Sequence, residues 1–328
     1  MKPPPEVFEP QLRAPCSPNG TEPGGTSHEW DNPNPNPSDP PWVSPCGGSK
    51  HTSSWCVMPA LRYFSAWFCP YAHRATMALA HHAASVRYEW VEALGWERRD
   101  SADANQREQG GEPEHENWYH WKHPDLLAAT EGEGLIPTFV DEKGRAIRES
   151  LVAVEYVDDL ARLQPAHAAP LVPQDPAEAA RCRWAAEWAN KHMCSPYYQM
   201  LVRTDEGERR RAFDTLLEDL ATWGSKRQGT FYCGETLSAA DISPLPWAWR
   251  YYILEHYRGF VIPRDDAQLK GFHEWRDAAV ALPAIASTLP DADRYLEHIG
   301  KYADASARSK VANAVRAGRA AHDLKVDD

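Results

Sequence analysis

The sequence predicts an α/β domain followed by an all-α domain, and three observations support this fold class. Segments with the alternating pattern of β-strands occur only between residues 61 and 147. Beyond residue 177, apolar side chains recur with helical spacing over long stretches. Residues 165–176, which hold four prolines, separate the two regions as a linker. A chain of 328 residues with 42% hydrophobic residues can bury two cores of this kind.

Residues 1–58 are predicted to form a Pro-rich leader outside both domains. Half of the 28 prolines lie between Pro3 and Pro59, and prolines alternate with asparagines over residues 32–37. Because proline lacks a backbone N–H and restricts the residue before it, such a segment forms neither a helix nor a sheet. We therefore expect a flexible, disordered leader with partial polyproline-II character.

The first domain, residues 59–164, is predicted to contain a β-α-β unit followed by a β-hairpin and a helix. Each expected element has the period of a strand or of a helix: a strand over 61–66, a helix over 71–84, a strand over 86–90, a helical turn over 126–129, strands over 136–141 and 146–147, and a helix from Ser150. The helix between the first two strands makes them parallel, whereas the turn at 142–144 makes the last two antiparallel. Residues 95–121 are charged and aperiodic, so we expect a surface insertion there.

The second domain, residues 177–302, is predicted to be a helical bundle. Its expected helices share a 3.6-residue period and cover 177–193, 206–226, 239–256 and 269–282. Ser238 and Asp241 have the spacing of a capping box at the start of the third of these helices. Residues 303–328 are expected to form a C-terminal tail.

The composition argues against several classes of function. Lys and Arg total 35 against 47 Asp and Glu, a net charge of -12, whereas nucleic acids and anionic membranes are bound by clustered cations. No apolar run approaches the roughly 20 residues of a membrane-spanning helix. The 7 cysteines are odd in number and thinly spread, which is typical of a reducing compartment. The N-terminus has no apolar signal segment, so we expect a soluble, cytoplasmic protein.

Cys69 lies where the first strand passes into the first helix, directly before Pro70. Proline suits the first helical position because its missing N–H would be unpaired there, so Cys69 is expected at the N-cap. The helix dipole and the free N–H groups favour a thiolate, and thiols in such settings have a pKa of about 3.5–7.5 instead of about 8.5. Ala72 stands where a Cys-x-x-Cys motif has its second cysteine, so thiol chemistry needs an external thiol. The alternative is a small buried side chain without chemistry.

Two further features fit a site that binds a small peptide. Pro137 begins a strand after a Gly-rich segment, and a cis proline there would let Ile136 offer its backbone to an extended peptide. An ordinary proline at a strand start is the alternative. Ser150 is a natural N-cap, and Glu149 precedes it. The N–H groups of this helix end could bind an α-carboxylate while Glu149 binds the adjacent ammonium group.

Three motifs in this order resemble those of the cytosolic glutathione transferases: CPYAHR at residues 69–74, Ile136-Pro137, and Glu149-Ser150-Leu151. The Cys-Pro-aromatic-Ala start is similar to the omega class. The resemblance extends over residues 61–302 and includes a glycine and capping box within residues 231–242. It implies the glutathione transferase fold, in which a thioredoxin-like α/β domain binds glutathione and an all-α helical bundle shapes the acceptor pocket.

The resemblance also implies a role for each matching residue. Cys69 would form a mixed disulfide with glutathione, and Ile136, before a cis Pro137, would pair with the cysteine of glutathione. The remaining residues fall into two groups, with Phe68, Lys122, Glu149 and Ser150 in the glutathione site and Tyr71, Tyr197, Trp247 and Arg250 in the acceptor pocket. Lys122 would meet the glycine carboxylate, although His123 separates it from the proline that follows the lysine directly in the omega class.

The activity implied by the resemblance is glutathione-dependent thiol transfer or reduction through Cys69, by deglutathionylation or by reduction of dehydroascorbate or glutathionyl-ketones. Glutathione would be the co-substrate of a small electrophilic or disulfide substrate, no metal would be needed, and the protein would be a homodimer. One alternative is a glutathionyl-hydroquinone reductase, because His73-Arg74 and the insertion are also similar to those enzymes. Another is a non-catalytic scaffold of the same fold, whose leader docks partners.

Overall fold

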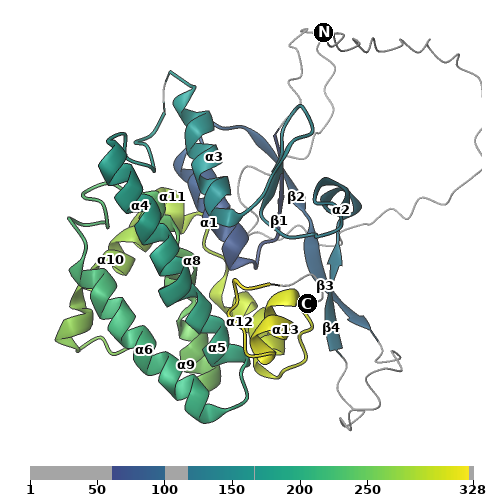
Figure 1. Ribbon diagram of the computed structural model, residues 1–328, viewed down its shortest axis with the longest axis vertical. Helices are drawn as coiled ribbons and strands as arrows, with labels where there is room; N and C mark the ends of the chain where they lie inside the picture. The colour runs from purple at the N-terminus through teal and green to yellow at the C-terminus, as the bar shows by residue number, and fades with distance from the viewer. Residues whose placement is uncertain (1–60, 100–116, 166, 325–328) are drawn as a thin grey trace, which may run out of the picture. The chain divides into compact units, whose positions relative to one another are not determined.

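The computed structural model describes residues 61–99, 117–165 and 167–324 (Figure 1). The expected leader, residues 1–58, lies outside the described residues, as do the centre of the expected insertion and the last four residues. Within the described ranges, no helix is both long and apolar enough to cross a bilayer.

A four-stranded mixed sheet forms the centre of the first domain, with the spatial order β2-β1-β5-β6. Its strands are β1 (Leu61–Ser65), β2 (Tyr88–Glu92), β5 (Thr138–Val140) and β6 (Ala146–Ile147). Strand β1 runs parallel to β2 and antiparallel to β5, and β5 is antiparallel to β6. The predicted parallel and antiparallel halves are therefore confirmed.

Helices cover both faces of this sheet, α1 (Pro70–His81) and α3 (Ser150–Arg162) on one and α2 (Pro124–Ala129) on the other (Figure 1). Successive side chains of a strand point to opposite faces, and β1 follows this rule. Tyr63 packs in the core that contains Val154 and Val157 of α3, whereas Phe64 packs with Leu126 of α2. Burial on both faces explains why β1 is apolar almost throughout.

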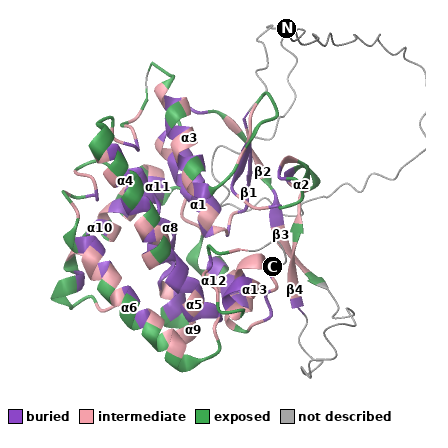
Figure 2. Ribbon diagram, viewed as in Figure 1, coloured by how far each residue is buried: buried purple, intermediate pink, exposed green. Residues whose placement is uncertain are grey.

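Helix α1 joins the two domains. It packs on α3 of its own domain and on α8 (Leu245–Arg250) and α11 (Pro283–Ala286) of the helical domain. Most of its residues are buried (Figure 2), and alanines at four positions allow the neighbouring helices to approach closely. A helix buried on all sides holds its ends firmly, and the N-terminal end of α1 carries Cys69.

The prediction of a surface insertion over residues 95–121 is wrong at both ends of that segment, which are β-strands. Strands β3 (Leu94–Arg99) and β4 (Asn117–Lys122) pair there as an antiparallel ribbon, and the residues between them lie outside the described ranges. Aromatic side chains along the ribbon pack on the helical domain, as Trp96 does against Tyr302 at a centroid distance of 5.7 Å. The high charge of the segment obscured this aromatic pattern, which is typical of strands.

The second domain is helical, as predicted, but more finely divided. Its elements are α4 (Pro176–Ala189), the π-helical turn η2 (Asn190–Cys194), α5 (Ser195–Val202), α6 (Glu206–Ser225), α7 (Ala239–Ile242), α8, α9 (Tyr252–Arg258), the 3₁₀ turn η3 (Ala267–Leu269), α10 (Lys270–Ala281), α11, α12 (Ala292–Ala303) and α13 (Lys310–Arg316). The single helix expected over 239–256 is three helices, and the first ends before Pro244, as proline requires. The capping box of Ser238 and Asp241 is confirmed at the start of α7.

The expected C-terminal tail is folded as far as residue 324. Helix α13 packs on α5 and buries Ala312, Ala314 and Val315. Ahead of it the chain hydrogen-bonds to β4, where Trp118 N–H donates to the carbonyl of Ser306 at 3.0 Å. The domain therefore does not end at residue 302, because apolar burial continues beyond it.

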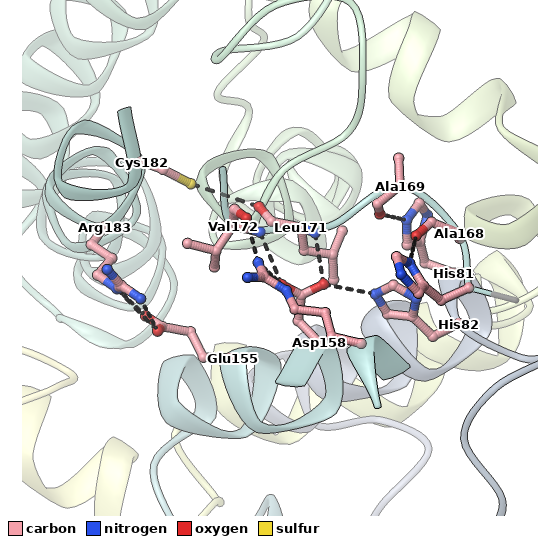
Figure 3. A network of polar contacts seen from close by, with 12 residues as sticks. His81, His82, Glu155, Asp158, Ala168, Ala169, Leu171, Val172, Cys182 and Arg183 are labelled. Atoms are coloured by element: carbon pink, nitrogen blue, oxygen red, sulfur yellow. Dashed lines mark hydrogen bonds and ion pairs between the residues drawn. The ribbon is translucent and has the colours of Figure 1, made fainter. Parts of the chain in front are cut away.

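Asp158 of α3 ties the linker to the first domain through a buried carboxylate (Figure 3). The carboxylate accepts hydrogen bonds from the backbone N–H groups of Leu171 and Val172, from His82 Nε2 and from Arg162. Burial alone would raise the pKa of Asp158, but these hydrogen bonds lower it to about 2. Leu171 and Val172 of the linker are thus fastened to the first domain.

Candidate functional site

A cavity of about 620 Å³ opens at the N-terminal end of α1, between the first domain and helices α12 and α13. Eight of the eleven predicted site residues line it: Phe68, Cys69, Tyr71, Lys122, Ile136, Pro137, Glu149 and Ser150. They come from four separate stretches of the chain, so the fold brings the three motifs together around one space.

Cys69 occupies the position that its sequence context predicts. It is the N-cap residue of α1 with an extended backbone (φ -76°, ψ 116°), and Pro70 is the first helical residue. Its carbonyl accepts the first helical hydrogen bond, from His73 N–H at 2.9 Å. Cys69 is partly exposed as a residue and lines the cavity.

The acidity of Cys69 differs from the expectation. Burial raises the pKa of the Cys69 thiol and is the largest influence on it. The N–H groups of Ala72 and Tyr71 lower the pKa, as do the positive charges of Arg250 and Arg74. The expected acidic thiol is therefore wrong: the helix end contributes as predicted, but desolvation in a narrow site outweighs it.

The rate of alkylation of Cys69 by iodoacetamide follows the thiolate fraction, so its midpoint in pH reports the pKa of the thiol. Because this pKa is raised, we expect the rate to go on rising above pH about 8.5, the ordinary pKa of a thiol. Arg250→Met should move the midpoint to higher pH, since it removes a charge that lowers the pKa. Mass spectrometry of the Cys69 peptide gives the rate at each pH. Arg264→Met, which removes an exposed arginine paired with Asp277, should leave the midpoint unchanged. A wild-type midpoint below pH about 7, or no shift with Arg250→Met, would contradict this electrostatic picture.

Three residues expected in the acceptor pocket lie behind the cavity wall instead. Trp247 and Arg250 are buried on α8, and Tyr197 is buried on α5. Trp247 packs edge-on against Tyr71 at a centroid distance of 4.8 Å, and Tyr197 supports Tyr198, which lines the cavity. Arg250 acts on Cys69 only through its charge. The expected sequence stretches are present, but their side chains face the core.

Arg74 is a buried cation at the cavity that sequence reasoning left without a role. Its guanidinium donates to Ser150 Oγ at 2.9 Å, to Asn190 Oδ1 at 2.9 Å and to the carbonyl of Ser243 at 2.8 Å. In the described part of the chain it pairs with no carboxylate, and only 1% of its surface is exposed. A buried positive charge with neutral partners favours an anion in the adjacent space.

The start of α3 forms the end of the cavity next to Arg74. Glu149 is the N-cap residue, with a positive φ of 71°, and Ser150 is the first helical residue. The expectation that Ser150 caps the helix is thus shifted by one position, and its hydroxyl accepts from Arg74 instead. The N–H groups of a 13-residue helix and a buried guanidinium together suit an α-carboxylate.

The Ile136–Pro137 peptide bond is cis, which is the isomer that the family resemblance implies. Within the described residues, neither the backbone N–H nor the carbonyl of Ile136 has a hydrogen-bond partner, and Ile136 lines the cavity. Unpaired backbone groups beside Cys69 can therefore receive the backbone of an extended peptide.

Lys122 marks the other end of the cavity. Its ammonium donates to the carbonyl of Glu133 at 2.8 Å, and its side chain lies over Gly134. Gly134 has a φ of +62°, and a Cβ there would collide with the lysine. Glycine at this position therefore allows both the turn and the close approach of Lys122.

Part of the cavity wall is aromatic and was missed from the sequence. It consists of Tyr119 and His120 of β4 with Tyr295 and Tyr302 of α12. Burial lowers the pKa of His120 to about 3, so the imidazole is neutral at physiological pH. Only the alternation of aromatic residues over 117–122 could have indicated this wall. Among the described residues, no group of three side chains is suited to holding a metal ion.

Comparisons with known proteins match this architecture in both domains. The family model described as "Glutathione S-transferase, N-terminal domain" matches residues 68–160, and the one described as "Glutathione S-transferase, C-terminal domain" matches residues 199–278. Together the two matches span more than half of the chain.

Two curated relatives cover most of the described chain at low identity. Glutathione S-transferase U26 of Arabidopsis thaliana is 25% identical over 234 residues, which are 71% of this chain and 90% of the relative. Glutathione S-transferase omega-1 of Mus musculus is 24% identical over 244 residues, which are 74% of this chain and 85% of the relative.

Solved structures share the fold. Glutathione transferase Omega 3C from Trametes versicolor superposes with a TM-score of 0.58 at 21% identity, covering 75% of this chain and 91% of its own. Rice GST1, solved in complex with glutathione, superposes with a TM-score of 0.57 at 20% identity, covering 75% of this chain and 98% of its own.

Proposed function

Because this chain belongs to the glutathione S-transferase family, we propose that it is an omega-like enzyme that transfers thiols between glutathione and small disulfide or electrophilic substrates. The observation that carries the proposal is the position of Cys69 on the wall of the cavity that Ile136, Glu149 and Ser150 also line. A cysteine there can form a disulfide with glutathione, whereas a serine or tyrosine hydroxyl could only donate a hydrogen bond.

Glutathione fits the cavity from one end to the other in this proposal. The γ-glutamyl carboxylate meets the N–H groups at the start of α3 beside Ser150, and Glu149 receives the ammonium group. The cysteine of glutathione pairs with the free backbone groups of Ile136, next to Cys69. The glycine carboxylate then extends toward Lys122. Phe68 packs beside the thiol as part of the same wall.

The proposed reaction has two exchange steps at one sulfur. The Cys69 thiolate attacks the glutathionyl sulfur of a mixed disulfide, forms a new disulfide with glutathione, and releases the substrate as a thiolate that takes up a proton. The thiolate of a second glutathione then attacks the glutathionyl sulfur on Cys69, releasing oxidised glutathione and restoring Cys69. Since the pKa of Cys69 is raised, only a minor thiolate fraction reacts at neutral pH, and the rate rises with pH.

The acceptor side favours flat or apolar groups. Tyr119, His120 and Tyr302 line the same cavity as Cys69. Glutathione mixed disulfides, dehydroascorbate and glutathionyl-ketones are the proposed substrates, and glutathionylated hydroquinones are a narrower alternative that uses the same cysteine. The aromatic wall is compatible with each of them.

The proposal is tested by measuring glutathione-dependent reduction of the mixed disulfide of glutathione and 2-mercaptoethanol, next to conjugation of glutathione to an aryl chloride. We expect strong disulfide reduction and weak conjugation, because the cysteine is consumed in disulfide exchange instead of stabilising a glutathione thiolate. Strong conjugation without disulfide reduction would contradict the proposal. We also propose a homodimer in the cytoplasm, as is usual for the family; light scattering gives the mass in solution.

A further inference from the structure

The C-terminal segment, residues 303–324, closes one side of the cavity. It is fastened to β4 by two backbone hydrogen bonds of Trp118, which donates to the carbonyl of Ser306 at 3.0 Å and accepts from Arg308 N–H at 2.8 Å. Arg308 further donates to the carbonyls of Ala305 and Ala307, so its guanidinium holds the segment itself in shape. Lys310 follows two residues later and lines the cavity.

Lys310 and Lys122 are two cations on the same part of the cavity. Lys122 ends the strand to which the C-terminal segment is hydrogen-bonded, so the two lysines are brought together by one contact. Burial lowers the pKa of Lys122 and the charge of Lys310 lowers it further, whereas the charge of Glu133 raises it. Two like charges close together and partly removed from water destabilise the protein when no ligand occupies the cavity.

Within the described residues, neither lysine forms an ion pair with a carboxylate. Glu133 lines the same cavity, but its carboxylate pairs with Arg148 at 2.9 Å, and Lys122 reaches only the carbonyl of Glu133. Among the described residues, Lys310 makes neither an ion pair nor a hydrogen bond. Two lysines that line one cavity without an ion-paired carboxylate are suited to a carboxylate supplied by a ligand.

We propose that Lys310 is a second cation for the glycine carboxylate of glutathione, so that the C-terminal segment completes the glutathione site. The inference rests on the proposed function, because it needs glutathione in the cavity with its γ-glutamyl end at Ser150. In that orientation the tripeptide passes Ile136 and ends beside Gly134, next to Lys122, in the cavity that Lys310 also lines. Lys310 acts as a positioning residue for the tripeptide, because in this proposal it contacts the glycine carboxylate and not the reacting sulfur.

The test compares S-methylglutathione, which cannot form a disulfide, with its glycine amide, which lacks the carboxylate charge. Titration calorimetry gives the Kd of each ligand for the wild-type protein and for Lys310→Gln. We expect Lys310→Gln to raise the Kd of S-methylglutathione about tenfold, or about 1.4 kcal/mol. The Kd of the glycine amide should change less than about twofold. Lys310→Arg should keep most of the affinity for the acid, because it keeps the charge.

The matched control is Lys143→Gln, which removes a lysine from an exposed turn away from the cavity and should change neither Kd. Equal weakening of acid and amide by Lys310→Gln, or no weakening of either, would overturn the inference while leaving the proposed function intact. If Lys310→Gln left the Kd of S-methylglutathione unchanged but raised the KM for an anionic acceptor, Lys310 would bind the acceptor and the inference would also be overturned. Failure of the wild-type protein to bind either ligand would overturn the proposed function as well.

Discussion

Replacement of Cys69 by serine is expected to reduce glutathione-dependent thiol transfer by at least about a thousandfold, because a hydroxyl cannot form the disulfide through which the reaction passes. Serine has almost the size of cysteine, and Cys69 is partly exposed, so the fold should be retained. The assay is reduction of the mixed disulfide of glutathione and 2-mercaptoethanol. Conjugation to an aryl chloride should increase in the same variant, since the serine hydroxyl can stabilise the thiolate of bound glutathione.

Cys233→Ser is the matched control for this prediction. Cys233 is also free and partly exposed, and contact with Cys182 lowers its pKa, so it is a competing thiol outside the cavity. Thiol transfer should be unchanged in Cys233→Ser. Full activity of Cys69→Ser, or loss of activity in Cys233→Ser, would move the reaction away from the cavity and contradict the proposed mechanism.

The substitution Asp158→Asn is expected to lower the free energy of unfolding by about 3–5 kcal/mol, because it breaks a buried, charged network while leaving its donors in place. The amide has one acceptor oxygen for four donors, and its own NH₂ group would face them. Urea unfolding followed by tryptophan fluorescence measures the loss. The neighbouring Asp159 is exposed, so Asp159→Asn should change the stability by less than about 0.5 kcal/mol.

The same carboxylate predicts how stability depends on acid. The pKa of Asp158 is lowered to about 2 in the folded protein and is about 3.9 in an unfolded chain. Its contribution is therefore complete above pH about 4 and is lost as the pH falls toward 2. The wild-type protein should lose more stability over this interval than Asp158→Asn. Parallel losses in the two proteins would show that the carboxylate does not carry the effect.

Elements whose pattern depends on their own residues were predicted well. Strand β1, helix α1 and the β5–β6 hairpin each form where the local pattern predicts them. The capping box at Ser238 was likewise readable, because it is a short motif with a local cause. The same holds for Cys69, whose position depends only on the start of one helix. The cis bond before Pro137 was implied only by the family resemblance, because the sequence around it allows either isomer.

Features created by contacts between distant segments were not predictable. The β3–β4 ribbon and the C-terminal segment support each other through Trp118 and Ser306, and neither shows a strong pattern alone. Lys310 reaches the cavity through this contact. Arg250 and Trp247 were expected on the wall because of a matching stretch, but the rotation of α8 about its axis points them into the core. The prediction of a lowered pKa for Cys69 was wrong for a related reason, because the desolvation of its thiol depends on the whole cavity.

The most direct test of the account is to treat the protein with oxidised glutathione and locate the adduct by mass spectrometry of its peptides. The account predicts one glutathionyl group on Cys69, released by excess reduced glutathione, with Cys233 serving as the internal comparison. An unmodified Cys69 after treatment at pH about 8.5, or a glutathionyl group found mainly on Cys233, would contradict the claim that Cys69 carries the reaction.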